Sequence, residues 1–387
     1  MHNAFSRAWH TWRVSNHAQS VNSIRAISEE REYSWLDARA SKSRESKGRQ
    51  RPEEPDDIRT DWQRDRDRII HTKAFRRLKH KTQVFVSPGR DHYRTRLTHT
   101  LEVTQIARTV ARALRLNEDL VEAIGMGHDL GHAPFGHVGE YALDDAYRKH
   151  DPDARFRHYE QSLRIVDELE NDGRGLNLTW EVRDGILHHS KGKSDLNVGQ
   201  SLDKWLARGK PSTLEGQIIR ICDRVAYVNH DIDDAIRAGL ISQDQLPRDC
   251  IAVLGARHSE RITTMVKAIV VASSEILPSS ERVVGERIAM QDEVMEATDR
   301  LKDWMFANVY KLDIVDQTPR ARVVIQALFD KFMEEPHLME GELARSCDGM
   351  STADRARCVC DYVAGMTDRF AAQTFADFFM PASWHGV

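Results

Sequence analysis

A dense group of histidines and acidic residues lies between residues 128 and 158. The group comprises His128, Asp129, His132, His137, Glu140, His150 and His158. Its tightest unit, His128-Asp129, offers an imidazole nitrogen and a carboxylate oxygen, and divalent transition metals accept both as ligands. Neighbouring side chains in mid-helix point in different directions, but Gly131 permits a turn that lets both converge on one ion. The pattern predicts a metal site that keeps positions open for water and substrate oxygens.

Two residues outside this group are the candidates for completing the site. His99 lies four residues before Val103, on the apolar stripe of a predicted helix. Asp223 lies among isoleucines and valines in the segment 214–236, where an unpaired carboxylate would be costly to bury. A bound metal removes that cost. A lone histidine on an apolar stripe is more often an ordinary core residue, and a lone aspartate more often faces solvent. The metal prediction therefore depends on the combination.

The elements that must position these residues are predicted to be helices. Apolar residues recur at helical spacing from Val103 to Leu114, and Asn117 is a suitable N-cap for the helix that leads to His128. Further helices are expected from residue 136 onward and over residues 159–169, 214–236, 259–277, 281–306, 319–334 and 354–380, with one short strand at 83–86. Glycine and proline are sparse, which favours long helices. The expected fold is an all-α helical bundle with additional C-terminal helices.

Composition excludes several classes of protein. The chain has 387 residues, 40% apolar and 30% charged, which is typical of a globular protein and not of a fibrous or disordered one. It contains no apolar run of the roughly 18–20 residues that span a membrane, and no continuous apolar segment of a secretory signal. Five scattered cysteines favour a reducing compartment, so we expect a cytoplasmic protein that does not engage a membrane.

Charge and polarity divide the chain into three expected parts. Residues 1–58 are predicted to be a polar N-terminal extension, exposed over residues 40–57 and with the composition of a mobile segment. Residues 59–247 are expected to form the catalytic core, and residues 248–387 a C-terminal helical region packed on it. Between Arg59 and Arg96 there are 12 Lys and Arg against 4 Asp and Glu, although the whole chain has a net charge of −4. The excess indicates an anionic partner, single-stranded nucleic acid among the candidates; the alternative is a solvated helix face.

Six segments carry a resemblance to a known family. DRDRIIHTKAFRRLKHKTQVF (65–85), DHYRTRLTHTLEV (91–103) and HDLGHAPFGHVGE (128–140) closely resemble the deoxynucleoside triphosphate triphosphohydrolases, in particular their bacterial dGTPase-like branch. FRHYEQS (156–162), CDRVAYVNHDIDDA (222–235) and CDYVAGMTDRFA (360–371) continue the match, which runs from about residue 59 to 375. The order His99, His128-Asp129, Asp223 matches the H…HD…D signature of HD-domain phosphohydrolases. The resemblance implies an all-α HD-domain bundle that hydrolyses dGTP, with other dNTPs as further candidate substrates, to deoxynucleoside plus triphosphate.

The resemblance also implies roles for individual residues. One divalent cation would be held by His99, His128, Asp129 and Asp223. His137 would be the catalytic histidine with Glu140 as its partner, and His132 would order the site or contact phosphates. Substrate contacts are implied for Gln83 (base), Arg96, His158 and Arg224 (phosphates), and Tyr227 and Asp231 (sugar), with Lys191 as a further phosphate candidate. Imidazole ligands are compatible with Mn²⁺, Fe²⁺, Co²⁺ or Zn²⁺; we expect Mn²⁺, or Mg²⁺ as the abundant cellular ion.

Two other functions stay open at this point. An HD-domain phosphodiesterase or alarmone hydrolase would share the metal ligands but would not need His137 and Glu140 or the pair Tyr227 and Asp231. A non-catalytic nucleotide- or nucleic-acid-binding regulator would use the basic segment 59–96. Members of the resembled family commonly form rings and bind dNTP effectors. We expect a homo-oligomer, because the basic segment and the long C-terminal helices suit contacts between subunits.

Overall fold

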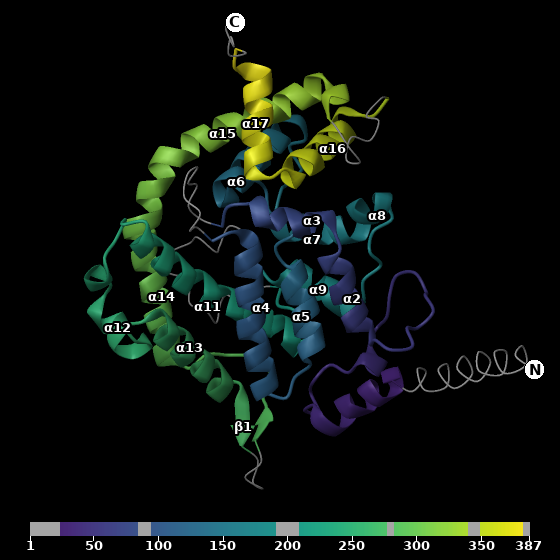
Figure 1. Cartoon of the computed structure of the whole chain (residues 1–387), viewed down its shortest axis with the longest axis vertical. Coiled ribbons are helices and arrows are strands. Elements are labelled where there is room, and N and C mark those ends of the chain that lie inside the picture. Colours follow the sequence, from purple (N-terminus) through teal and green to yellow (C-terminus); the bar gives the residue numbers. More distant parts are fainter. Residues whose placement is uncertain (1–23, 84–93, 191–208, 277–281, 340–348, 382–387) are drawn as a thin grey trace, which may run out of the picture.

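The computed structural model describes residues 24–83, 94–190, 209–276, 282–339 and 349–381, and helices dominate throughout (Figure 1). The predicted all-α fold is confirmed. The strands found within these ranges are β1 (Ser274–Ile276) and β2 (Arg282–Val284), which pair antiparallel. The predicted strand at 83–86 lies outside the described residues apart from Gln83, next to which Thr82 forms an isolated bridge with Thr95.

A central group of helices carries the residues singled out above. It consists of α2 (Asp61–Ile70), α3 (Lys73–Arg77), α4 (Arg96–Ala113), α5 (Glu118–Gly127), α6 (Gly136–His150), α7 (His158–Arg164), α8 (Glu170–Gly173), α9 (Trp180–His188) and α11 (Leu214–Arg237). Helix α4 packs on both α5 and α11, and its predicted apolar stripe is buried between them. Asn117 caps α5 as predicted, since its side-chain oxygen accepts from the backbone N–H groups of Asp119 and Leu120.

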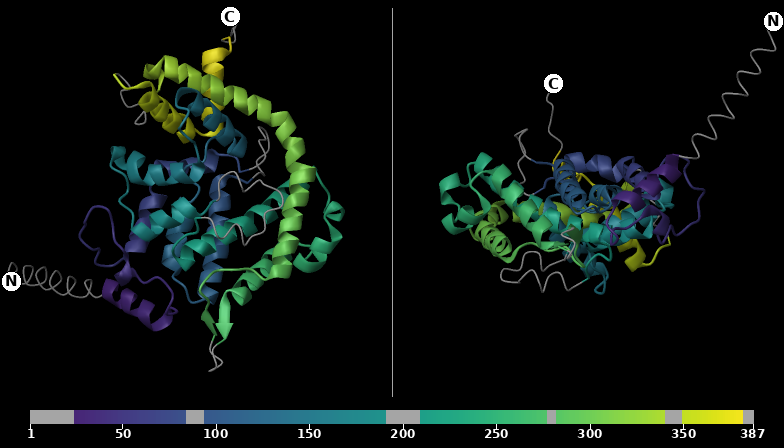
Figure 2. Two further views of the ribbon diagram at one scale, coloured as in Figure 1. Left: turned by 180° about the vertical axis from the view of Figure 1, so that it is seen from behind. Right: turned by 90° about the horizontal axis from the view of Figure 1, so that it is seen from below.

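The C-terminal helices wrap around this group. They are α12 (Arg248–Leu254), α13 (His258–Ala272), α14 (Asp292–Met305), α15 (Lys311–Glu334), α16 (Thr352–Gly365) and α17 (Asp368–Phe379). Helices α14 and α15 join through a π-helical turn, Phe306–Tyr310, and form one arc along the molecule (Figure 2). The arc begins against α12 and ends against α6, α16 and α17, where a second apolar cluster is buried.

Several predicted helix boundaries are wrong. The helix expected over 259–277 ends at Ala272, and the one expected over 281–306 begins only at Asp292, because the residues between them pair as β1 and β2. The helix expected over 319–334 already begins at Lys311 and contains Pro319. The helix expected over 354–380 is split, because Met366 is extended and Thr367 starts a new helix by accepting from the N–H of Phe370.

The exposure predicted for residues 40–57 is wrong for the inner part of that stretch. Lys42 is buried, and its ammonium group donates to the carbonyl oxygens of Asp37 and Ala40 at 3.1 and 3.2 Å. Arg49 pairs with the buried carboxylate of Asp65 and donates to the carbonyl oxygen of Asn177 at 2.7 Å. Polar composition predicted exposure here, but the buried charges of Lys42 and Arg49 both have polar partners, which offsets the cost of their burial. The domain boundaries at residues 58 and 247 stay predictions.

Candidate functional site

Four predicted metal ligands from three helices converge at the end of α5. His99 lies on α4, His128 and Asp129 follow α5, and Asp223 lies on α11. The Nε2 atom of His99 is 3.0 Å from Asp223 Oδ1 and 4.0 Å from Asp129 Oδ2. The Nε2 atom of His128 is 3.5 Å from Asp129 Oδ1 and 4.0 Å from Asp223 Oδ1. Two nitrogens and two carboxylates at these separations form a donor set suited to one divalent cation.

The tautomer of His128 supports this assignment. Its Nδ1 lies 2.7 Å from the carbonyl oxygen of Gly125, so Nδ1 carries the proton and donates it. The Nε2 atom therefore presents a lone pair to the site, and it is buried with no hydrogen-bond partner among the described residues. A lone pair left without a donor beside two carboxylates is what a bound cation would satisfy, because metal-binding histidines fix their tautomer through the other ring nitrogen.

The charged groups of the site strongly influence one another's pKa values. Burial raises the pKa of Asp223, but its contact with His99 outweighs this and lowers the pKa to about 2. Burial lowers the pKa of His99, and Asp223 raises it above its ordinary value. The pKa of Asp129 lies well below its usual range despite burial, because His128, His132 and Arg96 surround it; Arg96 donates to its Oδ2 at 2.9 Å. The carboxylates are thus held in the ionised form that a cation requires.

A second cluster of imidazoles adjoins this donor set. The Glu140 carboxylate contacts Nδ1 of His137 at 3.3 Å, as the i, i+3 spacing on α6 predicts, and Nδ1 of His158 at 3.0 Å. His132 stacks on His158 with ring centroids 3.9 Å apart, and its Nε2 is 3.2 Å from Asp129 Oδ1. Burial raises the pKa of Glu140, but His158 and His137 bring it well below its usual range. His137 is one-third exposed, whereas the other members are buried, so its ring is the one open to a ligand.

The chain reaches His137 through a tightly constrained loop. A Cβ at Gly131 would lie 2.2 Å from the backbone nitrogen of Ser162, so only glycine fits, and Ser162 Oγ binds both the Gly131 N–H and the His128 carbonyl oxygen. Further along, Phe135 has a φ of 63° and Gly136 a φ of 62°. A left-handed conformation costs a non-glycine residue roughly 1–2 kcal/mol, so Phe135 is held in this turn by its surroundings.

One cavity brings most of the predicted site residues together. It is lined by Gln83, Arg96, His99, Asp129, His132, His137, His158, His189, Ser190, Asp223, Arg224, Tyr227 and Lys302. Asp231 is buried on α11 and is not part of this lining in the described chain, while Lys191 lies outside the described residues. His150, at the end of α6, approaches Asp330 on α15 instead, at 3.8 Å. Arg224 lines the cavity and forms an ion pair with Asp299 of α14.

Three lining residues, His189, Ser190 and Lys302, were not predicted. His189 donates from Nδ1 to the carbonyl oxygen of Ile186 at 2.7 Å, so its buried Nε2 keeps a lone pair beside His128, with ring centroids 5.0 Å apart. The available sequence signal was the run His188-His189-Ser190, which directly precedes the phosphate candidate Lys191. Lys302 belongs to α14, far along the chain from the other residues, and no local pattern points to it.

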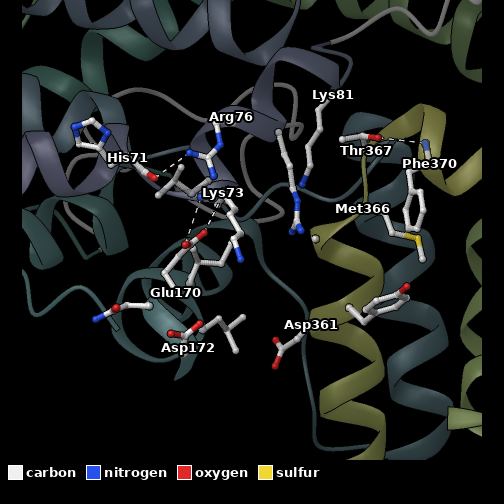
Figure 3. A pocket seen from close by; sticks show the side chains of 18 residues that line it. His71, Lys73, Arg76, Lys81, Glu170, Asp172, Asp361, Met366, Thr367 and Phe370 are labelled. Carbon is white, nitrogen blue, oxygen red and sulfur yellow. Dashed lines mark hydrogen bonds between the residues drawn. The ribbon is translucent and has the colours of Figure 1, made fainter. Parts of the chain in front are cut away.

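Within the described part of the basic segment 59–96, several arginines form ion pairs with acidic residues. Arginines of α2 pair with acids around them: Arg66 contacts Glu122 at 3.1 Å, and Arg64 contacts Glu53 at 3.1 Å. Its later part contributes to a second cavity of about 650 Å³, lined by basic side chains together with Glu170, Asp172, Asp361 and Phe370 (Figure 3). Much of the local charge excess is therefore neutralised within the protein.

Comparison with known protein families assigns the class. Residues 96–228 match the HD domain, and residues 288–377 match the phosphohydrolase-associated domain. The first range contains all four predicted metal ligands, and the second covers the arc and the last two helices. The protein is thus an HD-domain hydrolase whose site can hold a divalent metal. Among the described residues, no helix combines the length and apolar character needed to cross a membrane.

Whole-chain relatives make the assignment specific. A deoxyguanosinetriphosphate triphosphohydrolase-like protein of Caldanaerobacter subterraneus is 51% identical over 93% of this chain and 97% of its own length. Proteins of the same name from Desulfatibacillum aliphaticivorans and Clostridium perfringens are 47% and 44% identical over 92% and 88% of the chain and 98% and 92% of their own lengths. The chain belongs to the deoxyguanosinetriphosphate triphosphohydrolase-like family.

Proposed function

We propose that this protein is a metal-dependent dNTP triphosphohydrolase that converts dGTP, and other dNTPs that the base pocket accepts, to deoxynucleoside and triphosphate. One observation carries the proposal. Three of the four donor residues, His99, Asp129 and Asp223, line the same cavity as the imidazoles of the cluster around Glu140, and Asp129 lies beside both His128 and His132. A phosphoryl group bound at the donor set would therefore lie within reach of a proton donor.

The donor set of His99, His128, Asp129 and Asp223 would hold one divalent cation. Bound there, such an ion polarises a phosphoryl oxygen and makes a water molecule more acidic. Its identity is part of the proposal: mixed imidazole and carboxylate ligands suit Mn²⁺ well, and Mg²⁺ is the abundant alternative. Arg96 restrains Asp129 through Oδ2, which leaves Oδ1 facing His128 and His132.

His137 is proposed as the proton donor in P–O bond cleavage. Glu140 contacts Nδ1 of His137, which leaves Nε2 as the nitrogen available to the cavity. When water attacks the α-phosphorus, the bond from phosphorus to the 5′-oxygen breaks, and His137 delivers a proton to the departing 5′-oxygen. Glu140 fixes the imidazole orientation through its contact with Nδ1. Triphosphate then leaves as one piece.

Other lining residues support recognition of a deoxynucleotide. Arg96 and Arg224 carry guanidinium groups suited to phosphate oxygens, with His132, His158, Lys302 and the undescribed Lys191 as further phosphate contacts. Tyr227 on α11 is proposed to press against C2′ and exclude a ribose hydroxyl. Gln83 Oε1 is buried with no hydrogen-bond partner among the described residues, which supports its proposed contact with a base edge. Asp231, one turn beyond Tyr227 and buried, is proposed to support the sugar site from behind.

Product analysis tests this function. The protein is reconstituted with Mn²⁺ or Mg²⁺ and incubated separately with each dNTP and with GTP, and triphosphate, pyrophosphate, orthophosphate and nucleosides are quantified. Intact triphosphate in equal amount to deoxynucleoside is the expected result. Orthophosphate, pyrophosphate or a nucleoside monophosphate would support the phosphodiesterase or alarmone hydrolase instead. Absence of turnover, with binding that survives His128→Ala, would support the non-catalytic regulator. The homo-oligomer, the dNTP effector, the single-stranded nucleic-acid partner and the cytoplasmic location stay predictions.

A further inference from the structure

The start of α17 contacts the loop that leads into α6 and His137. The Oδ1 atom of Asp368, in the first turn of α17, accepts from the backbone N–H of Phe135 at 2.9 Å. Its other oxygen, Oδ2, accepts from the backbone N–H of Thr82 at 2.8 Å. One carboxylate thus ties together two segments of the catalytic cavity, since Thr82 precedes Gln83 and Phe135 lies two residues before His137.

Lys81 makes a parallel connection beside it. Its buried ammonium group donates to the carbonyl oxygen of His132 at 2.5 Å and to that of Ala364, on α16, at 2.8 Å. In Figure 3 the Lys81 side chain extends along the wall that also carries Thr367 and Met366. Three hydrogen bonds therefore join residues 364–368 to residues 81–82 and 135, and a fourth joins Lys81 to His132.

The residue that Asp368 contacts is the one under backbone strain. Phe135 adopts the left-handed conformation immediately before α6, and no side chain caps this helix through it. Strained residues near active sites persist when their surroundings over-determine the conformation. Burial of the Phe135 side chain in the second apolar cluster provides one restraint, and the carboxylate on its N–H provides the other. The φ of Phe135 sets the direction in which α6 leaves the loop, and with it the position of His137.

We propose that Asp368 is a positioning residue, which holds the strained turn at Phe135 and so places His137 in the cavity. This inference rests on the proposed role of His137. It assigns a task to the phosphohydrolase-associated segment, which supplies no residue to the metal-binding donor set. Asp368 does not touch the substrate; it acts through the backbone of Phe135 and Thr82.

A purely structural role is the competing explanation. An acidic residue in the first turn stabilises a helix by interaction with its dipole, and Asp368 occupies such a position on α17. Asp354 also lies in the first turn of its helix, as the third residue of α16, but it is exposed and makes no contact with the catalytic loop among its described interactions. Asp354→Asn is therefore the control, because it also removes a negative charge from a first helical turn and leaves the loop untouched.

The experiment compares full-length, Mn²⁺-loaded wild type with Asp368→Asn, Asp368→Glu and Asp354→Asn. The readouts are kcat, KM, metal content, melting temperature and amide hydrogen exchange of the peptide spanning residues 130–137. Asp368→Asn is expected to lower kcat by about 10- to 100-fold, as displacement of a catalytic group by roughly 1 Å does. Metal content should be unchanged and exchange of the peptide faster, and Asp368→Glu should recover part of kcat. Asp354→Asn should match the wild type.

Three results would overturn the proposal: unchanged kcat and exchange in Asp368→Asn, a loss that follows metal content, or equal losses in both asparagine variants. If Asp368→Asn does not fold, the glutamate variant supplies the same comparison, because its carboxylate is displaced by one methylene group. Exchange is measured without substrate. A wild type that fails to release triphosphate would therefore refute the proposed function, while faster exchange in Asp368→Asn would still show that Asp368 holds the loop.

Discussion

The Nδ1 atom of His99 lies 3.5 Å from the Nδ1 atom of His230, on the imidazole edge opposite to the one that faces Asp223. His230 is itself buried, and its Nε2 lies 3.2 Å from Oε2 of Glu102. The Nε2 atom of His99 is directed at the donor set. These contacts therefore fit a series of hydrogen bonds in which His99 donates to His230 and His230 donates to Glu102. Such outer partners fix the tautomer and orientation of a metal ligand.

Removing His230 should weaken metal binding without removing a ligand. We expect His230→Ala to reduce Mn²⁺ affinity by about 10- to 100-fold, because the His99 ring loses its hydrogen-bond acceptor. Equilibrium dialysis against Mn²⁺ measures this directly. His150→Ala, a change at the end of α6 outside the cavity lining, should leave affinity unaltered. Equal affinities in His230→Ala and the wild type would show that the contact does not orient His99.

His137→Ala should separate catalysis from metal binding. We expect kcat to fall by about 10²- to 10⁴-fold, the usual contribution of a positioned acid or base, while metal content and KM change little. The measurement combines triphosphate release with elemental analysis of the purified variant. Glu140→Gln should show a smaller loss, because the amide can still contact His137. Normal turnover by His137→Ala would refute the acid assignment.

The Tyr227 side chain should determine the selectivity of the site for deoxyribose over ribose nucleotides. Truncation in Tyr227→Ala opens space at C2′, so the ratio of kcat/KM for GTP to that for dGTP should rise by about tenfold or more, as for other steric pockets. Tyr227→Phe keeps the ring and should retain the wild-type ratio. Competition assays with both nucleotides report the ratio directly. A ratio that stays constant in all three proteins would exclude steric selection by this ring.

Metal should also stabilise the fold, since its proposed ligands come from three separate helices. Ligand binding to the native state alone adds about 2.7 kcal/mol to the free energy of unfolding at a concentration 100 times Kd. Thermal unfolding with Mn²⁺ should therefore give a higher Tm than unfolding with a chelator. Asp223→Asn should lose most of the difference. The donor set would be disproved by a wild-type Tm that is the same under both conditions.

Because of Lys81, the free energy of unfolding should change with pH in the alkaline range. Burial lowers the pKa of Lys81 to about 7, below the ordinary value of 10.5. Between these values the unfolded chain binds more protons than the folded chain, so this residue makes the free energy of unfolding rise with pH. Denaturant unfolding from pH 7 to 10 should show a steeper rise for the wild type than for Lys81→Met. The control is Lys79→Met, which removes one positive charge from an exposed position. Parallel pH profiles for Lys81→Met and the wild type would contradict the lowered pKa of Lys81.

Local features of the sequence predicted much of this protein. Helical periodicity located α4, α5 and α11, and the chemistry of Asn117 predicted the start of α5. The i, i+3 spacing predicted the contact between His137 and Glu140. These features could be predicted because each depends on residues within a few turns of one another. At that separation, backbone geometry determines which side chains come into contact. Helix ends after residue 258 were less predictable, since pairing of β1 with β2 and capping by Thr367 compete with helical propensity.

The sequence by itself determined the ligand types, the helices that carry them and, through family resemblance, the roles they would have. Only the tertiary structure decided which distant residues join the cavity. His189 and Lys302 line it, Asp231 is buried without being part of its lining, and Asp368 binds Phe135, shortly before His137, from 233 residues further along the chain. Contacts of this kind depend on the packing of whole helices against one another, and short-range periodicity carries no information about that packing.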